Sequence, residues 1–110
     1  MVPEAERLLE ADPPFTAAVC YQRRGHDALL HMCSHRGIRV PFDLSIAHFA
    51  SVWEREYLNF PTTRLEVPEP KMAEVGVELL LRKIQGRDTT DIPRAVVGKL
   101  CLGMTTGRPG

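Results

Sequence analysis

Three side chains of metal-binding types stand close together in the motif His31-x-Cys33-x-His35. The surrounding residues have helical periodicity, and successive residues of an α-helix are rotated by about 100°. The two histidines therefore share a face, whereas Cys33 points about 200° away from His31. A closed zinc site takes four ligands and only two converge here, so we expect a solvated helix face and no metal site.

Asp27, His31 and Ser34 are the ingredients of a catalytic triad, but they lie on the same expected helix. One exposed helix neither focuses three groups on a substrate nor supplies an oxyanion hole. The sequence also lacks the G-x-G-x-x-G and G-x-x-x-x-G-K-S/T motifs that cradle phosphates. We therefore expect no catalytic residues, no enzymatic activity and no cofactor.

The composition restricts the partners of the chain. Its 110 residues fit one small domain, and with 14 Lys+Arg against 14 Asp+Glu the formal net charge is zero. There is no basic excess to attract nucleic acid or anionic lipid, so we expect no direct contact with either. The N-terminal segment has no signal-peptide pattern, and the three cysteines stand in apolar runs typical of reduced, buried thiols. These features indicate a cytoplasmic protein.

Helices and strands alternate along the chain. The last expected helix is the clearest, with Pro70 suited to its first turn, but its apolar residues are too widely spread for one stripe, so two of its faces should be covered. Residues 52–63 show no clear period and are expected to form a loop. The expected elements are a helix over 3–10, a strand over 15–21, a helix over 24–36 ended by Gly37, strands over 44–50 and 64–67, a helix over 71–85 and a last strand over 95–104. This order predicts an α/β fold with a mainly parallel sheet flanked by helices.

In such a fold, ligands bind beyond the carboxyl ends of the strands. Gln22 and Arg23 follow the first strand, and Phe49 and Ala50 end the second. Arg23 is therefore a candidate ligand contact, although a solvated arginine is the alternative. Trp53 lies just past the second strand, where it could either stack on a ligand or cover apolar surface.

Several motifs occur in a specific order. The pattern G-x-x-V-P-x-D-x-S-I extends from Gly37 to Ile46, the step Pro61-Thr62-Thr63 follows, and the last strand ends in Thr105-Thr106. With these motifs, almost the whole chain resembles the C-terminal part of the lactose/galactose-repressor (LacI/GalR) family of bacterial transcriptional regulators.

The resemblance implies a three-layer, Rossmann-like fold of the periplasmic-binding-protein type I. In this family, two lobes close on a small-molecule effector and transmit the closure to a DNA-binding helix-turn-helix. We therefore expect residues 1–110 to form a single partial domain, an effector-sensing and oligomerisation fragment in which residues 66–90 cross into a missing first lobe. A DNA-binding headpiece absent from the chain would make the contact with DNA. The alternative is a solute-binding protein of the same fold that serves a transporter.

A crossing helix without its lobe exposes apolar surface, so we expect a homo-oligomer. In the family, the helix after the first strand and the loop after the second contribute to dimerisation. By position, the resemblance assigns this role to Asp27, Leu30 and Leu58, although Asp27 replaces a usually apolar residue.

The chain departs from the family where sugars are bound. Family members carry Asn-Asp where this chain has Gln22-Arg23, and Gly-aromatic-Asp-Asp where it has His48 to Ser51; Gly103 also replaces an arginine. Gln22 can still hydrogen-bond an effector hydroxyl, whereas Ala50 cannot. Arg23 is a fork-shaped donor suited to carboxylate or phosphate. We therefore expect an anionic or aromatic effector and not a neutral sugar.

Overall fold

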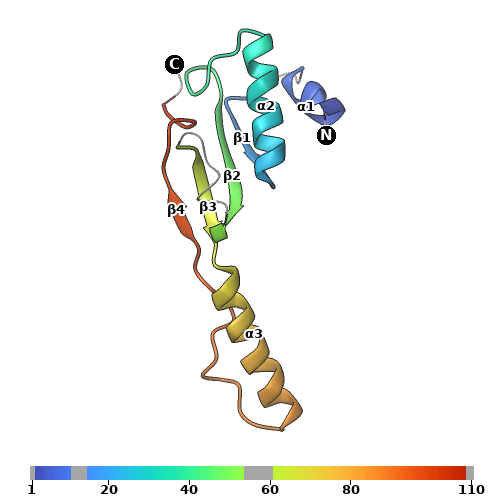
Figure 1. Cartoon of the computed structure of the whole chain (residues 1–110), viewed down its shortest axis with the longest axis vertical. Coiled ribbons are helices and arrows are strands. Elements are labelled where there is room, and N and C mark those ends of the chain that lie inside the picture. The colour runs from blue at the N-terminus through green and yellow to red at the C-terminus, as the bar shows by residue number, and fades with distance from the viewer. Residues whose placement is uncertain (1, 11–14, 54–60, 109–110) are drawn as a thin grey trace.

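The computed structural model describes residues 2–10, 15–53 and 61–108, which form a four-stranded sheet and three helices (Figure 1). The predicted alternation of helices and strands is confirmed. The middle of the expected loop over 52–63 lies outside the described residues. The elements are α1 (Val2–Leu9), β1 (Ala17–Cys20), α2 (Arg23–His35), β2 (Ser45–Ser51), β3 (Thr63–Val67), α3 (Glu69–Ile84) and β4 (Lys99–Cys101).

The sheet has the strand order β1-β2-β3-β4. The pairs β1–β2 and β2–β3 are parallel, with Val19 opposite Ala47 and Phe49 opposite Leu65, whereas β3–β4 is antiparallel. The prediction of a mainly parallel sheet is therefore confirmed. Because parallel strands run in one direction, the carboxyl ends of β1, β2 and β3 meet at the same edge of the sheet.

The core lies between α2 and one face of the sheet. Leu29 and Cys33 of α2 contact Leu44 and Ile46 at the start of β2, and all four side chains are buried. Burying a leucine or isoleucine stabilises the fold by about 2 kcal/mol. On the opposite face, large side chains such as Val19 remain exposed. The described residues thus cover one face of the sheet, as expected for a partial domain.

Local sequence signals set the boundaries of α2 and β2. Gly37 adopts φ +69°, and the N–H of Ile38 donates to the carbonyl of Cys33 at 2.9 Å, so the predicted left-handed cap is confirmed. A turn over residues 40–43 follows. Its Asp43 carboxylate accepts hydrogen bonds from the backbone and the guanidinium of Arg39, at 2.8 to 3.0 Å.

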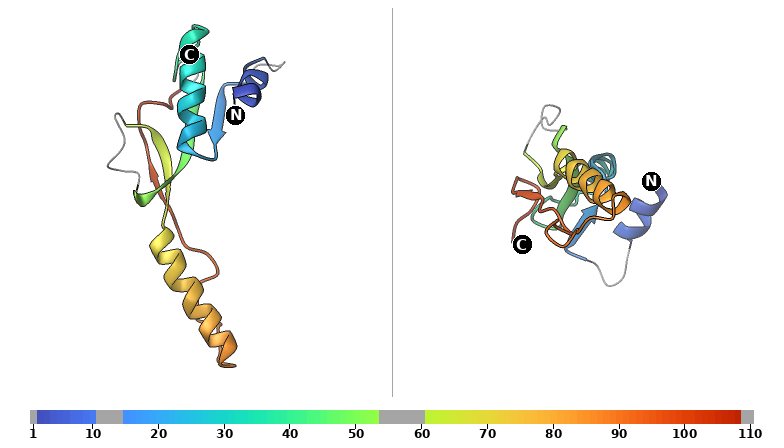
Figure 2. Two further views of the ribbon diagram at one scale, coloured as in Figure 1. Left: turned by 45° about the vertical axis from the view of Figure 1, so that its right-hand side comes forward. Right: turned by 90° about the horizontal axis from the view of Figure 1, so that it is seen from below.

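Helix α3 projects away from the sheet together with the segment that returns from it (Figures 1 and 2). The molecule is accordingly elongated, with extents of 58 × 30 × 24 Å. No residue of α3 is buried, so the covered faces predicted for it are not found within the described residues. Its exposed large apolar side chains are Met72, Val77, Leu80, Leu81 and Ile84. None of the described helices is long and apolar enough to cross a membrane.

The last strand is shorter than predicted. β4 spans only Lys99–Cys101, and on either side of it a glycine passes very close to neighbouring backbone. A Cβ atom at Gly103 would lie 2.5 Å from the carbonyl carbon of Thr62, and one at Gly98 would lie 2.9 Å from the carbonyl oxygen of Glu66. These two positions therefore require glycine for the close approach of the backbone.

Threonines of two separate motifs bond to one another at the start of β3, the end of this strand that lies away from α3. The Thr63 N–H donates to the Thr105 hydroxyl at 3.0 Å. The Thr63 hydroxyl accepts from the Gly103 N–H at 2.9 Å and lies 2.6 Å from the Thr106 hydroxyl. Thr63 and Thr105 are buried, so water does not replace these bonds.

Replacing Thr63 by valine should destabilise the fold by about 1–3 kcal/mol, because the Gly103 N–H loses its acceptor while it stays part-buried. Thr63→Ser keeps the hydroxyl and serves as the matched control. Urea unfolding of the three proteins measures the difference. Equal stability of Thr63→Val and the wild type would contradict this role of the hydroxyl.

Candidate functional site

A hollow of ≈ 750 Å³ lies at the carboxyl edge of the sheet, beside the N-terminal end of α2. Four of the five predicted ligand-binding residues line it, namely Gln22, Arg23, Phe49 and Ala50. They come together because the parallel strands β1 and β2 end at the same edge, as Figure 1 shows. The complete lining consists of Tyr21, Gln22, Arg23, Arg24, Phe49, Ala50, Ser51, Val67 and Glu69.

Trp53, the fifth predicted residue, does not line this hollow. Its side chain is 65% exposed, and its backbone N–H donates to the Ser51 hydroxyl at 3.2 Å. The aromatic side of the hollow is formed instead by Tyr21 and Phe49, whose ring centroids lie 6.3 Å apart. Tyr21 is 80% exposed, so a flat ligand could reach its ring.

The start of α2 concentrates positive charge at the hollow. A helix N-terminus carries a partial positive charge and normally favours acidic residues, but the first turn of α2 has none and begins with Arg23 and Arg24. Asp27 offsets part of this charge, with an oxygen 3.4 Å from Arg23 Nε. Gln22 is the N-cap residue, yet its side chain makes no capping hydrogen bond. This arrangement favours an anionic group at the mouth of the helix.

Sequence reasoning missed the carboxylate of this hollow. Glu69, in the first turn of α3, lines it from the side of β3. Its Oε1 atom is buried and accepts no hydrogen bond from the residues that the structure describes. Buried carboxylate oxygens normally have a donor, so Glu69 can accept one from a ligand. The hollow thus contains an acid although Ala50 occupies the position where family members carry one.

Two histidines from different elements meet in the interior. Their rings, His26 of α2 and His48 of β2, lie 4.5 Å apart and both are buried. His48 Nδ1 lies 3.0 Å from the carbonyl of Phe49, which can only accept, so this nitrogen carries the proton and Nε2 accepts from the Thr62 hydroxyl at 2.8 Å. Burial lowers the pKa of His26, and its hydrogen bond to Asp27 opposes this shift.

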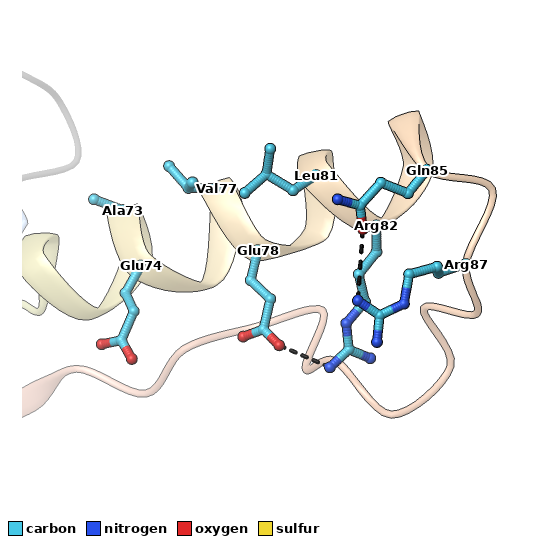
Figure 3. Close-up of a pocket in the computed structure, with 8 residues that line it drawn as sticks. All are labelled: Ala73, Glu74, Val77, Glu78, Leu81, Arg82, Gln85 and Arg87. Carbon is cyan, nitrogen blue, oxygen red and sulfur yellow. Dashed lines mark hydrogen bonds and ion pairs between the residues drawn. The ribbon is translucent and has the colours of Figure 1, made fainter.

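A second hollow, of ≈ 730 Å³, lies along α3 (Figure 3). Its apolar side chains lie on one side of the helix and its carboxylates on the other. The charges are largely paired within the chain, because Arg82 binds both Glu78, at 2.7 Å, and Asp91 of the return segment. This hollow is therefore part of an exposed helix surface of the kind that packs against another element. Its lining consists of Ala73, Glu74, Val77, Glu78, Leu81, Arg82, Gln85 and Arg87.

The residues assigned to dimerisation lie in different surroundings. The Asp27 side chain is about half exposed. Leu30, also on α2, is partly buried and packs against the core. Leu58 lies outside the described residues. Their role at an interface stays a prediction.

Comparison with known proteins places the chain in a family. The family model of the periplasmic-binding-protein-like domain matches residues 1–106. The repressor PurR of Vibrio atlanticus is 26% identical over 84 residues, which are 76% of this chain and 25% of that protein. The repressor MelR of Bacillus subtilis is 37% identical over 72 residues, 63% of this chain and 21% of that protein.

Solved structures of LacI-family regulators superpose on this chain. A LacI-family regulator from Bifidobacterium animalis subsp. lactis superposes with a TM-score of 0.79 at 24% identity, over 99% of this chain and 40% of that chain. One from a Rhodococcus species has a TM-score of 0.71 at 27% identity, over 96% of this chain and 39% of that one.

The chain therefore belongs to the periplasmic-binding-protein-like domain family. Within this family, the predicted resemblance to the effector domain of LacI/GalR-type regulators is confirmed. The chain spans about a quarter of the length of the curated relatives that it matches.

The free energy of unfolding should fall as the pH drops below the ordinary histidine pKa of 6.5. In that range, the unfolded chain protonates His26 to a greater extent than the folded chain, in which its pKa is lowered, so the unfolded state binds more protons. The slope from this group is at most about 1.4 kcal/mol per pH unit.

His26→Phe should flatten this pH dependence while keeping a ring against His48, whereas His35→Ala, at an exposed histidine, should retain it. Urea unfolding at a series of pH values provides the measurement. The same slope in His26→Phe and the wild type would show that His26 is not responsible.

Proposed function

We propose that this chain is the effector-sensing part of a LacI-type transcriptional regulator and that it binds a small molecule in the hollow at the carboxyl edge of the sheet. The observation that carries this proposal is the convergence of Gln22, Arg23 and Phe49 on that hollow. In α/β folds this edge is the usual ligand site, because helix N-termini and strand ends point into it.

The effector that fits this lining is anionic and carries a flat or aromatic part. Arg23 and Arg24, at a helix N-terminus, favour a carboxylate or phosphate, and Tyr21 and Phe49 offer ring faces. Glu69 adds an acceptor for a hydroxyl or amino group of the same ligand. Ala50, in contrast, has no polar side-chain atom to hold the paired hydroxyls of a neutral sugar.

Effector binding would regulate DNA binding by a part of the protein outside this chain. The curated relatives are described as helix-turn-helix repressors, and the chain spans about a quarter of their length. These relatives favour a cytoplasmic, non-enzymatic regulator over a solute-binding protein of a transporter. The remaining lobe would close over the hollow and exclude water from the ligand.

Arg23→Gln should weaken the binding of an anionic effector by about 10- to 100-fold, because a charge-assisted fork of hydrogen bonds is lost. Calorimetry of the complete regulator with benzoate, glucose 6-phosphate and glucose is the measurement. Arg36→Gln, at the other end of α2, is the matched control and should bind as the wild type does. Binding of glucose without binding of either anion would contradict the proposed effector class.

We also propose that the isolated chain associates with itself through α3. The apolar residues Val77, Leu80 and Ile84 follow one another at spacings of three and four, which brings them to one face of the helix. Each is more than half exposed. Soluble monomers rarely expose such a continuous apolar stripe.

Leu80→Glu should shift the chain toward monomer, because it buries a charge in the middle of the paired stripes. Size-exclusion chromatography with light scattering, over a range of concentrations, measures the mass. Lys83→Glu, at another exposed position of α3, is the control and should associate as the wild type does. A wild-type chain that is monomeric at every concentration would rule out this association.

A further inference from the structure

His31 and His35 form a close pair on the surface of α2. Their Nε2 atoms lie 3.0 Å apart, and their rings meet edge to face with centroids 4.4 Å apart. Both residues are exposed. The pair lies in the second half of α2, and His35 is about 18 Å along the helix from Arg23. It is therefore separate from the hollow at the start of α2.

The distance between the two nitrogens allows both of them to bind one metal ion. Imidazole nitrogens bind such ions at about 2.0–2.1 Å, and two bonds of this length that span 3.0 Å enclose an angle of about 94°. Adjacent positions in square-planar or octahedral coordination are about 90° apart. A tetrahedral ion would need the nitrogens about 3.3 Å apart, so the pair suits Ni(II) and Cu(II) better than Zn(II).

The surroundings favour a cation. His35 is the last residue of α2, where the carbonyl groups of the helix end give a partial negative charge. The nearest fixed cation along the chain, Arg36, has a carboxylate 3.6 Å away on Glu10. In the structure one histidine donates to the other; with metal bound, the donating ring would move its proton to Nδ1 and both Nε2 atoms would be free to coordinate.

We propose that His31 and His35 form an open surface site for a divalent transition-metal ion of the Ni(II) or Cu(II) type. The two Nε2 atoms supply adjacent ligands, and water occupies the remaining positions. Cys33, between them in sequence, is buried in the core on another face of the helix. Among the described residues, no group of three or more His, Cys, Asp or Glu side chains is arranged to hold a metal. The proposed site is therefore a two-ligand chelate, which goes beyond the solvated helix face expected from the sequence and is still not a closed zinc site.

Titration of the 110-residue chain with NiCl2 in a non-coordinating buffer, followed by calorimetry, tests this site. One ion should bind per chain. His31→Ala and His35→Ala should each weaken binding by about tenfold or more, because the second imidazole no longer binds intramolecularly. Ser34→Ala, between the two histidines, should bind Ni(II) as the wild type does.

A relocated histidine tests the geometry apart from the number of imidazoles. The double variant His35→Ala/Arg36→His keeps two histidines, but five residues apart they point about 140° away from each other. It should bind as weakly as His35→Ala, with far-UV circular dichroism confirming that α2 is intact. The proposal is wrong if the wild type binds no Ni(II) at about 1 mM. It is also wrong if the histidine variants bind as tightly as the wild type, since the ion would then occupy thiols or carboxylates.

Discussion

The arrangement of this chain depends on the hydrogen bonds that Thr63 makes with residues 103–106. They join the start of β3 to the residues that follow β4, so they hold the chain beside β3 after it has returned from α3. These bonds lie at the end of β3 away from α3, so they fix the path of the chain after it has returned and not the direction of α3. The close approach at Gly103, where a Cβ would lie 2.5 Å from Thr62, follows from the same junction.

The hollow at the carboxyl edge combines features that oppose local stability. Two arginines begin α2 where the helix dipole favours acids, and a buried oxygen of Glu69 lacks a donor among the described residues. Natural sequences tolerate such conflicts mainly where function requires them. A ligand with an acidic group and a hydrogen-bond donor would satisfy both groups at once, which agrees with the proposed effector class.

Much of the fold could be predicted because its signals are local. Apolar periodicity located α2 and β2, Gly37 marked the end of α2, and Pro70 marked the first turn of α3. The length of β4 could not be predicted, since the apolar run over 95–104 extends beyond the three residues that pair with β3. In the site, Gln22, Arg23, Phe49 and Ala50 could be identified because parallel strands share an edge. Glu69 could not, since it reaches the hollow only through the pairing of β3 with β2 and the direction of α3.

The sequence by itself determined the alternating α/β order, the mainly parallel sheet and the helix pair of His31 and His35, since each follows from periodicity within a short segment. The tertiary structure alone decided which polar groups are buried together. Glu66, predicted as part of a strand, is 1% exposed. The His48 ring is hydrogen-bonded to Thr62, fourteen residues away, and its centroid lies 4.5 Å from that of the His26 ring. Burial and contact of this kind depend on which distant segments lie side by side, and no local pattern encodes that.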